Sequence, residues 1–396
     1  MMAMEKNNKT LNVPNLRFPE FSGEWEKYTL GGIGTTFNGL TGKSANDFGS
    51  GSPYITYKSI FDNSKIDVSK IEYVRITETE RAKQTQNEVE YGDIFFTTSS
   101  ETPEEVGMAS VLLTPMPDCY LNSFCFGYRL FDKQDYLPDF FRFYLRSNNV
   151  RRKIAILAQG STRFNISKNE VMKMSIFLPS QNEQRKISEL FSLIEERIET
   201  QKKIIEDLKK LKDAINYNNL FDQSWKEYKI SEISVLGRGQ VISTIEISKQ
   251  KRPQYPVYSS QTSNNGIMGY LDDYDFDGEY ITWTTDGANA GTVFYRNGRF
   301  NCTNVCGTIK VDKNIDAYFL SVVLQSATAK YVSINLANPK LMNNTMASIK
   351  VKLPDIDTQK YWSRILRHID KKIETEFKYE NLLIQQKAYL LSQLFI

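Results

Sequence analysis

Two short runs of polar side chains, Thr97-Thr98-Ser99 and Thr284-Thr285-Asp286, each follow an apolar, strand-like stretch of the sequence. Hydroxyl groups at a strand end can donate to phosphate oxygens, and hydroxyl and carboxylate groups can hydrogen-bond the edges of nucleotide bases. Ordinary solvated loops contain the same residue types. For each residue taken singly, an exposed loop residue without a binding role therefore remains an alternative interpretation. The recurrence after two similar strands is what makes the runs candidates for a binding surface.

Basic and amide side chains in flexible turns form the second group of candidates. In Gly160-Ser161-Thr162-Arg163, a small turn lets an arginine approach a nucleic-acid backbone closely. Lysine and arginine suit guanine, and asparagine suits adenine. The triplet Arg151-Arg152-Lys153 is either such a contact or an exposed helix end. The full set of candidate binding residues is Lys43, Lys58, Thr97, Thr98, Ser99, Ser161, Thr162, Arg163, Lys249, Lys251, Arg252, Asn264, Asn265, Thr284, Thr285, Asp286 and Lys340.

Catalytic motifs are missing from the sequence. It contains no phosphate-binding P-loop, no nucleophile elbow, no clustered metal ligands and no Asp/Asn-Pro-Pro-aromatic motif of amino-methyltransferases. Gly237-Arg238-Gly239 is too short a glycine-rich piece to indicate a nucleotide site. The single histidine, His368, excludes histidine acid-base chemistry in both halves of the chain. We therefore expect no catalytic residue, no metal site and no cofactor on this chain.

Two long helices must position these candidates. From Leu178 to Phe221, apolar residues recur at alternating steps of three and four, which predicts one apolar seam along a helix. The stretch from Leu353 to Phe395 repeats it at a shift of 175 residues, so that Ile198-Glu199-Thr200 returns as Ile373-Glu374-Thr375. A matching repeat precedes each helix, because Trp25 and Tyr28 are answered by Trp225 and Tyr228. Such self-similarity predicts two tandem halves.

The repeat predicts an α+β protein with two tandem mixed α/β domains. Within each half, short β-type segments with Gly and Pro punctuation give way to a stretch of helical period and then to a final strand. Gly127 is aligned with Gly307 in this scheme. The two long helices are expected to pack as an antiparallel coiled coil, giving approximate two-fold symmetry. The predicted boundaries are 1–178 for the first domain, 179–222 for the central helix, 223–352 for the second domain and 353–396 for the C-terminal helix.

Composition is that of an ordinary globular protein. The chain has 396 residues, of which 40% are hydrophobic, and a formal net charge of +3. This small charge argues against binding a polyanion through a basic tail, so a basic face has to be made by folding. Neither a signal-peptide core nor a membrane-length apolar stretch is present, and we expect a cytoplasmic protein. The spacing of Cys119, Cys125, Cys302 and Cys306 predicts reduced structural thiols rather than a zinc site.

The chain resembles the type I restriction-modification specificity subunits, the HsdS family. The family pattern is an Asn-Ile-Ser lead, an Ile-x-Leu-Pro strand, a Glu-Gln pair and then a long helix. It is matched by Asn165-Ile166-Ser167, by Ile176-Phe177-Leu178-Pro179 and by Glu183-Gln184. The resemblance extends over nearly the whole chain and is weaker in the second half, where Asn344-Thr345 replaces the Asn-Ile-Ser lead.

The resemblance implies a protein that reads DNA and has no catalytic activity of its own. Each of two target-recognition domains would read one half of a bipartite site in double-stranded DNA, and the paired helices would fix the gap. Two modification (methyltransferase) subunits that use S-adenosylmethionine would dock on the helices. A restriction subunit, a translocase and nuclease that uses ATP and Mg, would join to cut DNA.

Two other functions remain open at the level of sequence. In the first, the chain is a coiled-coil scaffold that assembles partner proteins without binding DNA, and salt-dependent duplex binding would distinguish it. In the second, the chain is a nuclease, which the missing constellation of metal-binding carboxylates disfavours.

Overall fold

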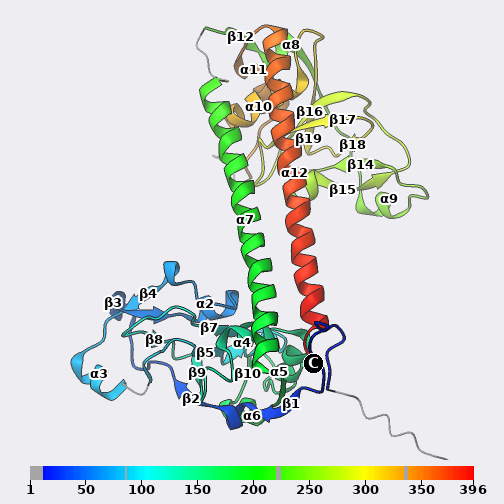
Figure 1. Ribbon diagram of the computed structural model, residues 1–396. Coiled ribbons are helices and arrows are strands. Elements are labelled where there is room, and N and C mark those ends of the chain that lie inside the picture. Colours follow the sequence, from blue (N-terminus) through cyan, green and yellow to red (C-terminus); the bar gives the residue numbers. More distant parts are fainter. Residues whose placement is uncertain (1–11, 85–86, 220–223, 334–337) are drawn as a thin grey trace, which may run out of the picture. The chain divides into compact units, whose positions relative to one another are not determined.

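The computed structural model describes residues 12–84, 87–219, 224–333 and 338–396. The chain forms two compact units, Met1–Gln201 with Tyr379–Ile396, and Lys202–Lys378. Each unit contains one mixed domain and a part of each long helix, as the sequence colours of Figure 1 allow the reader to follow. The predicted α+β class with two tandem domains is confirmed.

The first unit is built on a four-stranded antiparallel sheet. Its order is β2 (Gly34–Asn38), β9 (Cys125–Leu130), β5 (Ile94–Thr97) and β7 (Ala109–Val111). A three-stranded sheet has the order β4 (Glu72–Val74), β3 (Phe48–Ile55), β8 (Tyr120–Leu121). Two short pairs are β1 (Glu26–Thr29) with β11 (Ser175–Leu178), and β6 (Ser99–Ser100) with β10 (Phe164–Asn165). The helices are α1 (Leu30–Ile33), α2 (Tyr57–Asp62), α3 (Glu78–Gln84), α4 (Pro138–Tyr144), α5 (Asn148–Ile156) and α6 (Lys168–Lys173).

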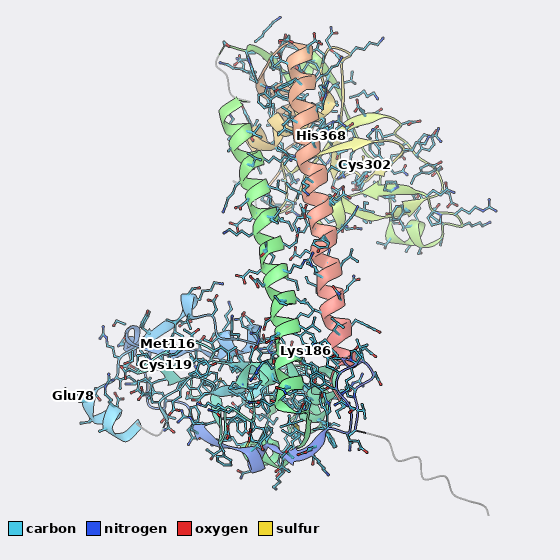
Figure 2. All side chains as sticks on the ribbon, in the orientation of Figure 1. Glu78, Met116, Cys119, Lys186, Cys302 and His368 are labelled. Carbon is cyan, nitrogen blue, oxygen red and sulfur yellow. The ribbon has the colours of Figure 1, made fainter. Side chains whose placement is uncertain are left out.

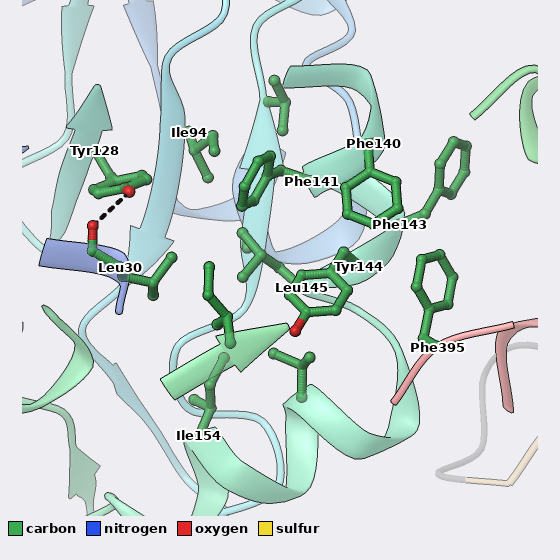
Figure 3. Close-up of a cluster of buried hydrophobic side chains, with 14 of the residues drawn as sticks. Leu30, Ile94, Tyr128, Phe140, Phe141, Phe143, Tyr144, Leu145, Ile154 and Phe395 are labelled. Atoms are coloured by element: carbon green, nitrogen blue, oxygen red, sulfur yellow. Dashed lines mark hydrogen bonds between the residues drawn. The ribbon is translucent and has the colours of Figure 1, made fainter. Parts of the chain in front are cut away.

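Aromatic side chains of α4 form the centre of the first unit's core (Figure 3). Phe140 and Tyr144 stack on each other and both contact Phe395, which follows the last helix of the chain. Tyr128 of β9 is fully buried, and its hydroxyl donates to the carbonyl of Leu30 at 2.8 Å. Burying such rings contributes to the apolar stabilisation of this domain, and their contact with Phe395 fixes the end of the C-terminal helix to it.

The second unit repeats these elements. Its four-stranded sheet has the order β13 (Ser234–Arg238), β19 (Cys306–Val311), β16 (Glu279–Thr284), β17 (Val293–Asn297). Its three-stranded sheet is β15 (Ile267–Leu271), β14 (Tyr255–Tyr258), β18 (Asn301–Cys302), and its two-stranded pair is β12 (Lys226–Lys229) with β20 (Lys350–Leu353). The α-helices are α8 (Ile230–Ile233), α9 (Thr244–Ser248), α10 (Ala317–Ala327) and α11 (Asn343–Ser348).

Strand register corrects one alignment made from the sequence. Thr97 pairs with Cys125, and Thr284 pairs with Cys306, so Gly307 is equivalent to Phe126 and not to Gly127. The physical reason is that the large side chain is distributed differently over the two neighbouring strands in the two units. Phe126 stacks on Phe96 in the first unit, whereas in the second unit the larger ring of Trp283 lies over Gly307 and leaves no room for a side chain there.

The long helices are α7 (Gln181–Asn219) and α12 (Ile356–Gln393), and they pack antiparallel within each unit. In the first unit, Lys387 of α12 donates to Glu195 of α7 at 2.5 Å. In the second, Lys212 of α7 donates to Asp370 of α12, also at 2.5 Å. Glu195 and Asp370 are 175 residues apart, and so are Lys212 and Lys387. The sequence repeat therefore places the same interhelical ion pair once in each unit.

A buried glutamine attaches each long helix to its domain. The Gln184 side chain accepts from the Leu137 amide at 3.0 Å and donates to the Pro179 carbonyl at 3.0 Å. Gln359 makes the equivalent bonds, accepting from the Asp316 amide at 3.0 Å and donating to the Pro354 carbonyl at 2.9 Å. The glutamine shared by both halves of the sequence thus joins the start of the spacer helix to the start of α4 or α10.

Candidate nucleic-acid interface

A polar surface forms in the first unit where β5 ends. β6 pairs with β10, and the amide of Ile166 donates to the Thr98 carbonyl at 2.9 Å. This pairing brings the Thr97–Ser99 run beside the turn that contains Ser161–Arg163, although 61 residues lie between them in sequence. Gly160 has φ of +133°, and a Cβ there would lie 2.2 Å from the carbonyl of Arg163, so only glycine fits this turn.

The three polar residues at the end of β5 have different environments. Thr97 is fully buried, and its hydroxyl accepts from the Met108 amide at 3.0 Å, so its side chain serves the fold. The Thr98 hydroxyl donates to the Phe124 carbonyl at 2.7 Å and is partly exposed. Ser99 is 5% exposed, and its carbonyl accepts from the Tyr57 hydroxyl at 2.6 Å. Thr98 is therefore the one of the three that faces solvent.

The turn beside it presents exposed side chains. Ser161, Thr162 and Arg163 are all exposed. Burial raises the pKa of the Tyr57 hydroxyl, and the nearby positive charge of Arg163 partly offsets this rise. The Tyr57 hydroxyl donates to the Ser99 carbonyl, and Ser99 pairs with Asn165, two residues after Arg163. Lys58 is exposed on α2 and follows Tyr57 in the sequence. Arg163 and Lys58 are therefore exposed positive charges on two segments that contact this strand end.

Lys43 has an internal role instead. Its ammonium contacts both carboxylate oxygens of Glu80 at 2.6 and 2.7 Å, and its side chain is only 8% exposed. The hydrogen bond from Lys43, followed by those from Thr77, lowers the pKa of Glu80 to about 2. The charge of Lys43 is therefore neutralised within the domain.

Arg151, in the basic triplet of the sequence, is also internal. Its guanidinium donates to the carbonyls of Glu104, Val106 and Gly107 at 2.8, 2.5 and 2.7 Å. Burial lowers the pKa of Arg151 to about 10. This side chain thus holds the loop that precedes β7.

The second unit places a charged cluster where β16 ends. Thr284 and Thr285 are buried, and the Thr285 hydroxyl donates to the Asp286 carboxylate at 2.7 Å. Arg238 and Lys340 each lie 3.3 Å from Asp286. The hydrogen bond from Thr285 and the charges of Lys340 and Arg238 lower the pKa of Asp286. The predicted residues Thr285, Asp286 and Lys340 are brought together, although Lys340 comes from a distant loop.

Arg238 is a member of this cluster that sequence reasoning missed. It is the last residue of β13, and its Nε donates to the Asn304 carbonyl at 2.5 Å. Its guanidinium also donates to the Thr285 hydroxyl at 3.1 Å. The signal in the sequence that could have identified Arg238 is a basic residue at the end of a predicted strand, followed by a glycine. The structure explains that glycine, because a Cβ on Gly239 would lie 2.1 Å from the Cys302 carbonyl.

Asn264 and Asn265 form an exposed left-handed turn. Their φ angles are 48° and 53°, and Gly266 follows at 82°. Asparagine tolerates this region better than most residues, yet two in succession are uncommon in a fold. Behind them, a Cβ on Gly266 would lie 3.2 Å from Nη2 of Arg296, which is buried and stacked 3.6 Å from the ring of Tyr258. The turn therefore rests on a buried arginine and presents two amide side chains.

The remaining basic candidates lie near the three-stranded sheet. Lys249, Lys251 and Arg252 are exposed in the segment after α9. The backbone amides of Lys251 and Arg252 donate to Asp272, which follows β15, at 3.1 and 2.7 Å. Within the described part of the chain, no contact joins these three side chains to Asp286.

A polar cleft of about 510 Å³ opens beside Thr98 in the first unit. Lys168, the first residue of α6, donates from its ammonium to the side-chain oxygen of Asn38, the last residue of β2. Sequence reasoning missed both. The lining is Asn38, Gly39, Thr41, Asn87, Thr98, Ser123, Cys125, Phe126, Ile166 and Lys168, which includes no acidic side chain among the residues described. The cleft therefore offers hydroxyl and amide groups with one positive charge.

No metal site or membrane helix accompanies these surfaces in the described residues. No group of three or more His, Cys, Asp or Glu side chains converges within those ranges. All four cysteines are buried free thiols whose pKa is raised by burial, including Cys119 and Cys302, which are labelled in Figure 2. Among the helices described, none has the length and apolarity needed to cross a bilayer.

Comparison with known proteins gives sequence matches to type I specificity subunits. The chain is 47% identical over 146 residues to a putative type I specificity subunit N-terminus of Mycoplasma pneumoniae, covering 37% of this chain and 76% of that protein. It is 40% identical over 148 residues to the type I restriction enzyme MpnII specificity subunit of the same organism, covering 37% of this chain and 44% of that one. The chain thus spans less than half of the second relative's length.

Solved structures share the fold over nearly the whole chain. The S subunit of a type I restriction-modification system from M. genitalium superposes with a TM-score of 0.64 at 17% identity, covering 97% of this chain and 99% of that one. A chain from a study of type I R-M complex assembly and conformational transition gives 0.56 at 14% identity, covering 94% and 97%. The model of the type I restriction modification DNA specificity domain matches residues 22–210 and 222–383. The chain therefore belongs to the type I restriction-modification DNA specificity family and contains two copies of its domain.

Proposed function

We propose that this chain is the DNA-specificity subunit of a type I restriction-modification complex and that each domain reads one half of a bipartite duplex site. The target-recognition domains are residues 1–178 and 223–352, with spacers at 179–222 and 353–396. The observation that carries this proposal is that the same strand arrangement occurs in both units with different side chains at equivalent positions. Thr98-Ser99 in the first unit and Thr285-Asp286 in the second occupy the same strand end but present different hydrogen-bonding groups.

In this proposal the spacer helices set the gap between half-sites and dock two modification subunits. Large apolar side chains remain exposed on helices that are already paired, and such surfaces are typical of protein contacts. In the first unit these include Leu193, Leu382 and Tyr389, exposed to 64, 61 and 61%. S-adenosylmethionine would belong to the modification subunits, and ATP and Mg to the restriction subunits. The specificity subunit itself contributes recognition and not chemistry.

Domain replacement tests the function. Assembled with a modification subunit, the chain is expected to direct adenine methylation to one bipartite site, and the isolated chain to transfer no methyl group. Replacing residues 223–352 by the corresponding domain of a relative should change one half-site and leave the other unchanged, as methylome sequencing would show. If both half-sites change together, the domains do not read independently. If the chain shows no salt-dependent duplex binding, it is a scaffold for partner proteins.

Arg163→Ala is expected to weaken recognition of one half-site. The exposed arginine lies beside the Thr98 strand end, and loss of a two-pronged guanine contact costs about 1–3 kcal/mol at one base position. Binding to duplexes that vary one base at a time measures this effect. A uniform loss over all sequences would instead assign Arg163 to phosphate. Unchanged affinity at moderate salt would remove Arg163 from the interface.

Lys43→Met is expected to leave DNA affinity and its salt dependence unchanged, because Lys43 is already neutralised by Glu80. The matched variant is Lys58→Met, which removes an exposed charge and should reduce the slope of log affinity against log salt by roughly one if Lys58 contacts phosphate. Titration over a range of salt concentrations distinguishes the two variants. A reduced slope for Lys43→Met would show that its pairing with Glu80 opens on DNA.

A further inference from the structure

The two units have equivalent positions around the ends of β5 and β16. The strand pairings of β2 with β9 and of β13 with β19 show which residues correspond. Asn38 pairs with Phe126 at the end of one ladder, and Arg238 pairs with Gly307 at the end of the other. The Thr98 amide donates to the Phe124 carbonyl, and the Thr285 amide donates to the Val305 carbonyl. These registers equate Ser123 with Asn304. Lys168 and Asn343 are equivalent as the first residues of α6 and α11.

The frame around these positions is the same in both units. A Cβ on Gly39 would lie 2.0 Å from the Asn122 carbonyl, as one on Gly239 would lie 2.1 Å from that of Cys302. Each glycine is followed by a parallel bridge, Leu40 with Asn122 and Gln240 with Thr303. The backbone therefore follows one path in both units, while the side chains that it presents differ.

The cation and the amide exchange places between the units. In the first, the amide is on β2 at Asn38 and the cation is on α6 at Lys168. In the second, the cation is on β13 at Arg238 and the amide is on α11 at Asn343, which donates to the Gly237 carbonyl at 3.0 Å. The Asn343 side-chain oxygen is buried and has no partner among the described residues. If the fold required these side chains, both units would place the cation and the amide in the same way. Only the threonine, Thr98 in the first unit and Thr285 in the second, is the same in both.

We propose that these positions form the base-selecting surface of each domain. They are Asn38, Thr98, Ser123 and Lys168 in the first unit, and Arg238, Asp286, Asn304 and Asn343 in the second, where the buried Thr285 holds Asp286 in place. The inference rests on the proposed function and identifies the residues that carry it out. Six of the eight, at 38, 123, 168, 238, 304 and 343, are not evident as candidates from the sequence.

The chemistry of the two sets differs in one decisive respect. The cleft of the first unit offers a lysine and an amide, with no acidic side chain among its described lining residues, so it favours a base edge of acceptors such as guanine O6 and N7. In the second, Asp286 adds carboxylate oxygens, which Arg238 and Lys340 each approach to 3.3 Å. A carboxylate accepts from an exocyclic amino group such as that of cytosine. The second half-site is therefore expected to require an amino-bearing base where the first requires an acceptor.

Single substitutions in the assembled methyltransferase test this. Lys168→Met is expected to slow methylation about 10- to 100-fold at sites with the normal first half-site and to relax one base position there, without altering the second half-site. Arg238→Met should do the same to the second half-site alone. The control for Lys168 is Lys173→Met at the exposed end of the same helix, where the charge pairs with Glu170 and should be dispensable for recognition.

Methylome sequencing and thermal melting of each variant complex decide between the outcomes. Base preference that changes in only the predicted half-site supports the proposal. An unchanged methylome with unchanged rate, or a uniform slowing over all sequences, overturns it, the latter because it indicates a phosphate contact. If Lys168→Met lowers the melting temperature, Lys168→Arg is used instead, and an unchanged base preference there with unchanged rate also counts against the proposal. A wild-type complex that methylates no bipartite site refutes the proposed function itself.

Discussion

Glu195→Ala is expected to destabilise the first unit by about 3 kcal/mol, a large effect for a single residue on a spacer helix. Glu195 lies between two cations, the guanidinium of Arg142 on α4 and the ammonium of Lys387 on α12. Arg142 is 4% exposed, and its Nε already has no hydrogen-bond partner among the described residues. Removing the carboxylate leaves the buried guanidinium with one carboxylate, that of Asp139 at 2.9 Å, and the ring of Phe143.

The equivalent substitution in the second unit provides the matched control. Asp370→Ala removes the same interhelical pair, but Asp370 is 40% exposed and its other partner is the neutral hydroxyl of Tyr318 at 2.5 Å. A loss of about 1 kcal/mol is therefore expected there. Denaturant unfolding of both variants measures the difference. Equal losses would show that the ion pair, and not the buried Arg142, determines the cost.

Matched insertions of four residues in both spacers, after Thr200 and after Thr375, are expected to change the gap between half-sites and nothing else. α7 has 39 residues and is therefore ~58 Å long at ~1.5 Å per residue. Four residues add ~6 Å, roughly two base pairs at ~3.4 Å each, and rotate the helix end by about 40° beyond one full turn. Inserting at both equivalent positions preserves the pairing of Glu195 with Lys387 and of Lys212 with Asp370.

Methylome sequencing of this variant is the measurement. The two half-sites should keep their sequences, because the strand-end clusters are untouched, while the unread gap lengthens. A four-residue insertion after Gly298 is the control. Gly298 is in the turn between β17 and β18, and no atom lies within 4 Å of where its Cβ would be, although its backbone pairs with Gly278. The gap should then stay the same. An active double-insertion variant with an unaltered gap would contradict a role of the spacer helices in setting the spacing.

The sequence by itself determined the tandem organisation of this protein. Apolar periodicity and self-similarity are local properties of a chain, so the repeat of Ile198-Glu199-Thr200 as Ile373-Glu374-Thr375 was sufficient to predict two halves, each with a long helix. The strand-end runs were visible for the same reason, because they follow strand-like segments directly. Even the shared glutamines, Gln184 and Gln359, were readable as a repeat before their bonds to α4 and α10 were known.

Only the tertiary structure decided which polar residues face solvent and which of them meet. Lys43 is neutralised by a carboxylate 37 residues away, and Thr97 is sealed in the sheet, so neither is available as a contact despite a suitable side chain. Lys168 and Asn38 meet across 130 residues, and Arg238 reaches Asp286 across 48. Burial and ion pairing depend on distances between segments far apart in the chain, which residue type and local spacing do not encode.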